Sequence, residues 1–423
     1  MNSTYTKIKA ILLLCILLVF GTMTISAQER NDSISSSSAD ADNIKISLVT
    51  CSPGQLVYEL FGHTAIRVED PKHRQDLVFN YGVFNFNTDN FVYRFVKGET
   101  DYELGVVEWK YFIHEYAMRG SSIDVQEINL TTDEKIEVVN YLLNNYEPQN
   151  RTYRYNYFYD NCTTRARDVI EESVAGQVFY IPVNNHLTFR DIVHQFTYEH
   201  PWSELGIDFC LGSASDRPID QRQQMFVPSY TEKMFTSAII KDIEGNNRRL
   251  INKTFQALPI GPQPDASEFP LSPMTVFWTI CIISVVIVLI EQKQHKIFWG
   301  VDIIVGLLHG LSGVIIAFLF FFSVHPTVDT NWLVLVFNPL PLLWLPFSVV
   351  WTIRHKPDRL HIINVLVLLV FLACMPFIPQ VFNACIYPIL LTFCLRSVSH
   401  LLWQYHPSSL VHRLPFRKHN HTD

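Results

Sequence analysis

The sequence predicts an α+β exported domain followed by a transmembrane domain of five helices. Three observations support this fold class: a secretory-type N-terminus, alternating strand and helix patterns across residues 44–245, and long apolar runs from residue 273 onward. A chain of 423 residues is long enough for both domains. The net charge of −7 comes without a basic stripe, so nothing indicates a nucleic-acid partner.

The first residues have the pattern of a secretory signal. A positive segment with Lys7 and Lys9 precedes an apolar run and a cleavage-type motif that ends at Ala27. We therefore expect residues 1–27 to be a signal peptide and the Ser-rich residues 28–43 to be a disordered leader. A signal that is not cleaved becomes an additional membrane anchor.

The exported half opens with strand patterns. Residues 44–49 and 63–68 alternate, and residues 77–84 are a third strand candidate that pairs with the second as a hairpin. His63 begins the second strand directly after Gly62, a position that suits a general base. A hydrogen-bonded core histidine is the alternative interpretation, and the histidine alone favours it.

Further patterns fill the exported domain, for which we expect the bounds 44–245. Helices are predicted over 109–118, 131–146, 187–193 and 228–238, and a strand over 123–128. Residues 201–220 have a loop composition, and residues 246–272, polar and rich in proline, are predicted to be the linker to the membrane. Residues 85–104 are rich in aromatic side chains, which indicates core packing or, beside a membrane, an acyl-chain site.

The most informative stretch is an aromatic run that leads into a helix. Asp160 and Asn161 are good N-cap residues, and a helical pattern runs from Cys162 to Ser173. Unpaired N–H groups and the macrodipole favour an anion in the first turn, so the pKa of Cys162 is lowered and a thiolate nucleophile forms. The alternative is an inert, buried cysteine behind an ordinary helix start.

Cysteine usage supports a free thiol. Only Cys51, Cys162 and Cys210 are expected to face an oxidising, exported compartment. Because three is an odd number, at most one disulfide forms among them and at least one thiol stays free. The count does not identify which one.

The second half is membrane-spanning. We expect a transmembrane domain over 273–403, with spans near 273–290, 297–323, 332–353, 361–378 and 381–403. Lysine and arginine cluster after the first and third spans and in the tail, residues 404–423, whereas the alternate connections have none. The positive-inside rule therefore places the tail in the cytoplasm and residues 28–272 on the exported side, in agreement with the signal.

Three polar residues lie in or near the third span, namely His325, Asn331 and Asn338. Polar groups at membrane depth are costly unless they face a cavity or another helix. They indicate either turn chemistry and helix packing or a lipid-binding groove open to the exported face.

A histidine that begins a strand, followed later by a cysteine that begins a helix, resembles the circularly permuted papain-like group. That group includes the lecithin:retinol acyltransferase-like enzymes and the NlpC/P60 proteins, which use a thiol to accept an acyl group. A third residue orients the histidine in such sites. Asn80 and Tyr81, on the strand paired with that of His63, are the candidates, and ordinary sheet packing is the alternative for each.

Four short motifs and the membrane half together are similar to the DUF4105 family, which contains the Lnb lipoprotein N-acyltransferases. The motifs are residues 62–67, 80–84, 155–158 and 161–165. The resemblance implies transfer of an acyl chain from a phospholipid to the α-amino group of a diacylglyceryl-cysteine lipoprotein. It also implies a bacterial inner-membrane protein whose catalytic domain lies in the periplasm. No metal-ligand spacing occurs, and we expect no cofactor.

The roles expected for this chemistry follow from residue type. Cys162 attacks the ester and His63 moves the protons. Asn161, beside the backbone N–H of Cys162, is expected at the oxyanion. Arg165 steers phosphate or holds the helix start, and Arg67 is predicted to contact substrate.

Two other classes of protein compete with this hypothesis. One is an NlpC/P60-type amidase or peptidase that cuts cell-wall peptides with the same pair of residues. It does not account for five spans, because its substrates are soluble polymers. The other is a non-enzymatic membrane assembly factor in which Cys162 forms a disulfide with Cys51 or Cys210.

Overall fold

The computed structural model describes residues 42–84, 90–263 and 269–405. The expected signal peptide, nearly all of the leader and nearly all of the tail lie outside the described residues.

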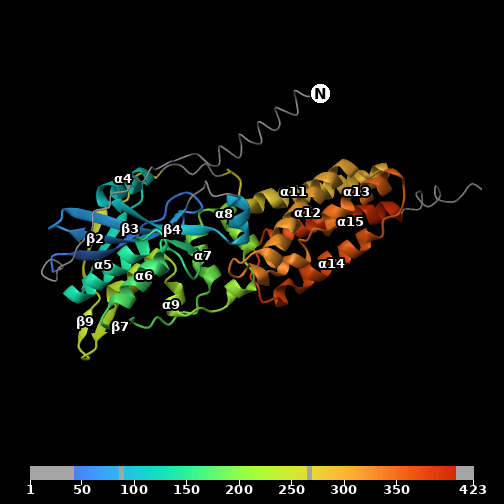
Figure 1. Cartoon of the computed structure of the whole chain (residues 1–423). Coiled ribbons are helices and arrows are strands. Elements are labelled where there is room, and N and C mark those ends of the chain that lie inside the picture. Colours follow the sequence, from blue (N-terminus) through green and yellow to red (C-terminus); the bar gives the residue numbers. More distant parts are fainter. Residues whose placement is uncertain (1–41, 85–89, 264–268, 406–423) are drawn as a thin grey trace, which may run out of the picture. The chain divides into compact units, whose positions relative to one another are not determined.

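A seven-stranded antiparallel sheet forms the centre of the exported half (Figure 1). Its strand order is β10-β5-β1-β2-β3-β4-β6, and the hairpin predicted for β2 and β3 is present. The strands are β1 Lys45–Cys51, β2 His63–Asp70, β3 Gln75–Phe84, β4 Asp101–Glu108, β5 Ile123–Ile128, β6 Thr152–Arg154 and β10 Ile251–Leu258.

Helices cover both faces of this sheet (Figure 1). The helices of the exported half are α3 Phe91–Lys97, α4 Trp109–Arg119, α5 Thr132–Tyr146, α6 Cys162–Ser173, α7 Phe189–Thr197, α8 Pro201–Cys210, α9 Gln221–Gln224 and α10 Pro228–Ser237, of which α4, α5, α6 and α10 pack on the strands. On one face, Phe112 of α4 packs with Val49 in a closed apolar cluster. On the other face, Thr163 of α6 contacts Thr64 of β2, and α10 accepts a hydrogen bond from Gln126 of β5. Because successive side chains of a strand point to opposite faces, α4 contacts one face of the sheet, whereas α6 and α10 contact the other.

Two stretches differ from their predicted structure. The expected linker, residues 246–272, contributes two strands in its first half, β10 and β9 (Asn247–Arg249). β9 belongs to a three-stranded sheet with β7 (Gly176–Phe179) and β8 (Ile239–Asp242). β10 is an edge strand with mostly exposed residues, so its sequence lacks the alternation that marks a half-buried strand. The predicted loop at 201–220 begins with α8, because proline is well tolerated at the first helical position.

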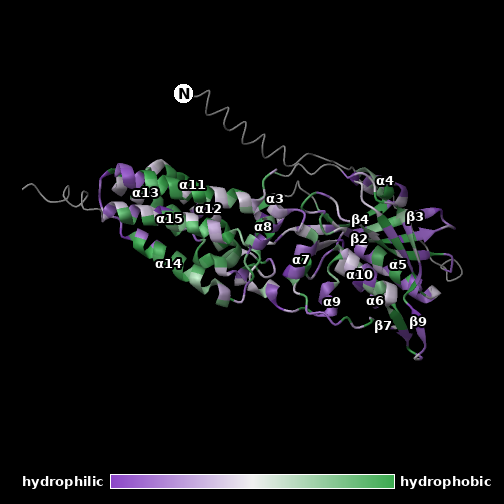
Figure 2. Ribbon diagram, turned by 180° about the vertical axis from the view of Figure 1, so that it is seen from behind, coloured by the Kyte–Doolittle hydropathy of each residue, from purple (hydrophilic) through white to green (hydrophobic). Residues whose placement is uncertain are grey.

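Five helices in the described part of the second half are long and apolar enough to cross a membrane, as predicted (Figure 2). The regular helices are α11 Pro273–Gln294, α12 Trp299–Phe322, α13 Leu340–Ile353, α14 Leu360–Cys374 and α15 Ile386–Gln404, and with their adjoining 3₁₀ turns the third span covers Trp332–Ile353 and the fourth Leu360–Phe377. The third span starts at Trp332 with a short 3₁₀ turn and is interrupted before α13. An α+β domain followed by five membrane helices is therefore the fold.

The membrane helices are joined by a buried ion network. Arg396 of α15 donates two hydrogen bonds to Glu291 of α11, at 3.0 and 2.9 Å, and also contacts Asp302 of α12 at 2.7 Å. A buried charge is tolerated when it is paired and hydrogen-bonded, and here one guanidinium serves two carboxylates.

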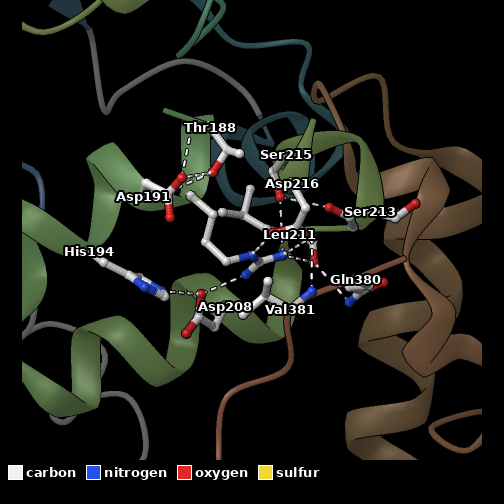
Figure 3. Close-up of polar contacts among 12 residues, drawn as sticks. Thr188, Asp191, His194, Asp208, Leu211, Ser213, Ser215, Asp216, Gln380 and Val381 are labelled. Carbon is white, nitrogen blue, oxygen red and sulfur yellow. Dashed lines mark hydrogen bonds and ion pairs between the residues drawn. The ribbon is translucent and has the colours of Figure 1, made fainter. Parts of the chain in front are cut away.

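A second polar network joins the exported domain to the membrane helices (Figure 3). Arg190 of α7 contacts Asp208 at 2.6 Å and Asp216 at 2.7 Å, and all three lie in the exported domain. From the membrane half, the amide of Asn383 donates to Asp208 at 3.0 Å and the N–H of Val381 donates to Asp216 at 3.2 Å. This junction holds the exported domain against the start of the last membrane helix.

Candidate active site

The start of α6 fixes the position of Cys162. The side-chain oxygen of Asn161 accepts hydrogen bonds from the N–H groups of Thr163 and Thr164, at 2.8 and 2.9 Å. Its amide nitrogen donates to the carbonyls of Tyr157 and Phe226, both at 2.8 Å. Asn161 is therefore the cap that its residue type predicts, and its amide is fully engaged in backbone contacts rather than directed at a substrate.

His63 begins β2 beside the end of β1. The preceding Gly62 has a φ of +75°, and a Cβ there would lie 2.5 Å from the carbonyl oxygen of Cys51. Only glycine fits this close approach in that backbone conformation. Nε2 of His63 donates to Oδ1 of Asn80 on β3, at 2.5 Å, which leaves Nδ1 for the thiol of Cys162.

An irregularity in β3 makes room for the nucleophile. The pairing with β4 shifts register between Asn80 and Val83. Gly82, inside the shift, has a φ of +93°, and a Cβ there would lie 3.6 Å from the Cβ of Cys162. The irregularity thus brings the backbone of β3 at Gly82 against Cys162.

The electrostatic environment produces a reactive thiol. Burial by itself raises the pKa of Cys162, but the charge of His63 and hydrogen bonds from His63, the Thr64 N–H and the Thr163 hydroxyl lower this pKa to about 7. Burial lowers the pKa of His63, yet the Cys162 charge and the hydrogen bonds with Cys162 and Asn80 raise it overall. The pair can therefore exist as thiolate and imidazolium near neutral pH.

Two threonine hydroxyls lie close to the sulfur of Cys162. The hydroxyls of Thr64 and Thr163 lie 3.1 Å apart and are buried, and that of Thr163 lies 3.8 Å from the sulfur of Cys162. Sequence reasoning missed both residues. The available signal was their position, since each directly follows one of the two predicted catalytic residues.

Tyrosines around the cysteine were also missed as candidates. The hydroxyls of Tyr153 and Tyr157 are buried and have no hydrogen-bond partner within the described residues. Burial, and then the charge of nearby Cys162, raises the pKa of Tyr157 well above its ordinary value, so this phenol stays protonated. A buried O–H without an acceptor, within electrostatic reach of a nucleophile, is available as a donor to a substrate oxygen.

Three other predicted site residues have different contacts. The hydroxyl of Tyr81 accepts a hydrogen bond from Asn145 at 2.8 Å, so of the two candidates only Asn80 is bonded to His63. Arg165 forms a two-point ion pair with Asp160 and stacks on a tyrosine ring, an arrangement that holds the helix start. Arg67 forms a similar two-point pair with Asp76.

The polar residues predicted near the third span form caps and junction contacts. Nε2 of His325 donates to the carbonyl of Phe95 at 2.7 Å. Asn331 is buried, and its amide donates to the carbonyl of Phe209 at 2.8 Å. Asn338 accepts a hydrogen bond from the N–H of Leu340 at 3.1 Å, at the start of α13. The turn-and-packing interpretation describes all three contacts.

The described residues contain one group of three possible metal ligands, namely His194, Glu204 and Asp208. Arg190 lies 2.6 Å from Asp208, and its positive charge opposes a metal ion at that carboxylate. We therefore assign this group to the domain junction. Cys51, Cys162 and Cys210 are all free thiols.

The fold and this site define a multi-pass membrane protein whose exported domain brings a cysteine, a histidine and an asparagine into one chain of contacts. The sequence matches family models for the Lnb N-terminal periplasmic domain over residues 30–195 and for the Lnb transmembrane domain over residues 264–408. The chain belongs to the Lnb family, and it is a membrane protein related to lipoprotein maturation with a periplasmic N-terminal domain. No match was found among curated proteins or among solved structures.

Proposed function

We propose that the protein is a lipoprotein N-acyltransferase. It moves an acyl chain from a membrane phospholipid, through a thioester on Cys162, to the α-amino group of a diacylglyceryl-cysteine lipoprotein. The observation that carries this proposal is the contact of His63 with Cys162 on one side and with Asn80 on the other, in a domain attached to five membrane helices. We place the protein in the bacterial inner membrane.

In the first half-reaction the thiolate of Cys162 attacks the ester carbonyl of the phospholipid. A carbon–sulfur bond forms and the ester carbon–oxygen bond breaks. The imidazolium of His63 gives its proton to the leaving alcohol, which departs as the lysophospholipid. The backbone N–H of Cys162 and the hydroxyl of Tyr157 donate to the oxyanion, a role supported by the unpartnered phenol beside the thiol.

In the second half-reaction the free amine of the lipoprotein attacks the thioester. A carbon–nitrogen bond forms, the carbon–sulfur bond breaks, and His63 accepts the proton that the amine releases. The thiolate is restored, paired again with the imidazolium. Asn80 keeps the ring oriented through both steps, because its acceptor oxygen holds Nε2 in the protonated form.

Two observations weigh against the competing hypotheses. A cell-wall amidase uses the same pair of residues but needs no transmembrane domain, whereas this chain has five spanning helices tied to its exported domain. An assembly factor with Cys162 in a disulfide disagrees with its free thiol.

The test uses lipoproteins from bacterial cells that lack this protein and are complemented with variants. We expect N-acylated lipoprotein N-termini with the wild-type protein, seen by mass spectrometry of N-terminal peptides, and diacylated ones with Cys162→Ala or His63→Ala. Cys210→Ala is the matched control, because it removes another free thiol of the same domain. N-acylated lipoproteins in the Cys162→Ala cells would contradict the proposal.

A further inference from the structure

Helix α3 is fastened to the exported end of a membrane helix. Three consecutive residues after α12 donate hydrogen bonds to the last carbonyls of α3. The bonds run from Ser323 to Val96 at 2.9 Å, from Val324 to Lys97 at 2.8 Å and from His325 to Phe95 at 2.7 Å. The Phe95 carbonyl also accepts the N–H of Gly98 at 3.0 Å, and the residues that follow α12 supply the further donors at the C-terminal end of α3. The contact sets the height of α3 at the outer surface of the membrane.

The same helix presents apolar side chains to the outside. Val92, Tyr93 and Phe95 are 62, 56 and 48 % exposed. The ring of Tyr93 lies 6.0 Å from that of Phe318 on α12, whose neighbour Phe322 is 63 % exposed. Exposed apolar surface on α3 is therefore continuous with the lipid-facing surface of a membrane helix, and lipid is the partner that this continuity indicates.

A row of aromatic rings leads from α3 to the candidate active site. The rings of Phe95, Phe91, Phe84, Tyr102 and Tyr155 follow one another at centroid distances of 6.0, 6.3, 5.3 and 4.2 Å. Phe84 follows Gly82 by two residues on β3, and a Cβ on Gly82 would lie 3.6 Å from the Cβ of Cys162. The row thus connects the membrane side of the domain with the surroundings of the nucleophile.

None of the five residues of this row is classed as fully buried. Phe95 is exposed, and Phe91, Phe84, Tyr102 and Tyr155 are each partly exposed rather than fully buried. Acyl chains in one leaflet reach about 15 Å, half of a hydrocarbon core of about 30 Å. The row consists of four ring-to-ring steps of 4.2 to 6.3 Å each, and their combined length is of the same order as this reach.

We propose that α3 lies in the outer membrane interface and that the aromatic row binds the acyl chain of the phospholipid donor as its ester reaches Cys162. Only the delivery of the ester to Cys162 rests on the proposed function, because the contact of α3 and the row with lipid requires no reaction. Burial of the chain along the row, at about 25 cal/mol per Å² of apolar surface, supplies the binding energy.

The first test maps the lipid contact without catalysis. Full-length protein carrying Cys162→Ala is placed in phosphatidylcholine vesicles that contain a phosphatidylcholine with a photoreactive acyl chain. After illumination, we expect cross-linked residues in α3 and at Phe84, Tyr102 or Tyr155, in addition to the membrane helices. Cross-links confined to the membrane helices would overturn the inference.

The second test measures the dependence of acylation on this surface. For each variant, the rate at which Cys162 gains an acyl group from vesicle phospholipid is divided by the rate with a water-soluble short-chain ester. We expect Tyr93→Glu and Phe84→Asp to lower this ratio about tenfold or more, because the first places a charge on the exposed apolar surface of α3 and the second places one in the aromatic row. Ile243→Glu, on an 86 % exposed side chain of the β8–β9 turn, is the matched control and leaves the ratio unchanged.

The outcomes separate the two proposals. An unchanged ratio in both charged variants would overturn the lipid path while leaving the acyltransferase intact. Wild-type protein that gains no acyl group from phospholipid, yet cross-links along the row, would refute the proposed chemistry and support the lipid site.

Discussion

The amide oxygen of Asn80 lies 2.5 Å from Nε2 of His63, although the two residues are 17 positions apart and belong to adjacent strands. Phe79 pairs with Ile66, so the β2–β3 register brings the next residue, Asn80, toward the start of β2 on the same face of the sheet as His63. The contact fixes both the ring orientation and the tautomer, so that Nδ1 faces the thiol of Cys162. The catalytic role proposed for His63 depends on this contact.

Replacing Asn80 tests that dependence. We expect Asn80→Ala to slow acylation of Cys162 by phospholipid by a factor on the order of 10², because the imidazole loses its orienting acceptor. Tyr81→Phe is the neighbouring control, since its hydroxyl contacts Asn145 and not the histidine. Equal losses in the two variants, measured as initial rates by mass spectrometry, would contradict the positioning role.

The pH dependence of thiol reactivity tests the ion pair. The pKa of Cys162 is lowered to about 7, so the thiolate and its alkylation by iodoacetamide rise as pH increases through about 7. In His63→Ala the positive partner is absent, so the midpoint shifts upward toward the value of an ordinary thiol. A midpoint that does not move in this variant would argue against a direct Cys162–His63 interaction. Cys210, whose pKa burial raises to about 11, is the internal comparison.

Local sequence patterns predicted part of the candidate site. Cys162 after its cap and His63 at its strand start follow from short-range rules, and Asn80 was one of two neighbours left open. Sequence alone did not select Asn80 over Tyr81, because the choice depends on the register of β3 against β2, which decides which of the two shares a face with His63.

Other features depend on contacts that no local pattern shows. The free hydroxyl of Tyr157 is a property of the packed site. β10 pairs with β5, more than a hundred residues earlier in the chain, and the Arg190 network joins the two halves of the protein. The two-point ion pairs of Arg165 and Arg67 appear only once their carboxylates are placed in space.

Helix capping gives a stability prediction. We expect Asn161→Ala to lower the free energy of unfolding by about 1–2 kcal/mol, because it removes the acceptor for two N–H groups at the start of α6. Asn161→Ser keeps a good N-cap acceptor without adding a charge and loses the bonds to Tyr157 and Phe226, so it should cost less. Thermal unfolding in detergent compares the variants. A larger loss for the serine variant would show that the cap is not the main contribution.

The junction between the domains gives a second stability prediction. Arg190→Met leaves Asp208 and Asp216 buried without their cation, so we expect a loss of about 3–5 kcal/mol. Arg222→Met is the matched control, because Arg222 is half exposed and pairs with Asp168 at the surface; it should cost about 0–1 kcal/mol. Similar unfolding midpoints for both variants would contradict the prediction that the junction stabilises the fold.

The most direct test of the central claim is the intact mass of the purified full-length protein after incubation with phospholipid vesicles. The account predicts a gain of one acyl group on wild-type protein, released by hydroxylamine as expected for a thioester and absent from Cys162→Ala. A hydroxylamine-sensitive acyl group that persists at the same level in Cys162→Ala, or wild-type protein that transfers acyl chains to a lipoprotein amine without ever carrying one on Cys162, would contradict it.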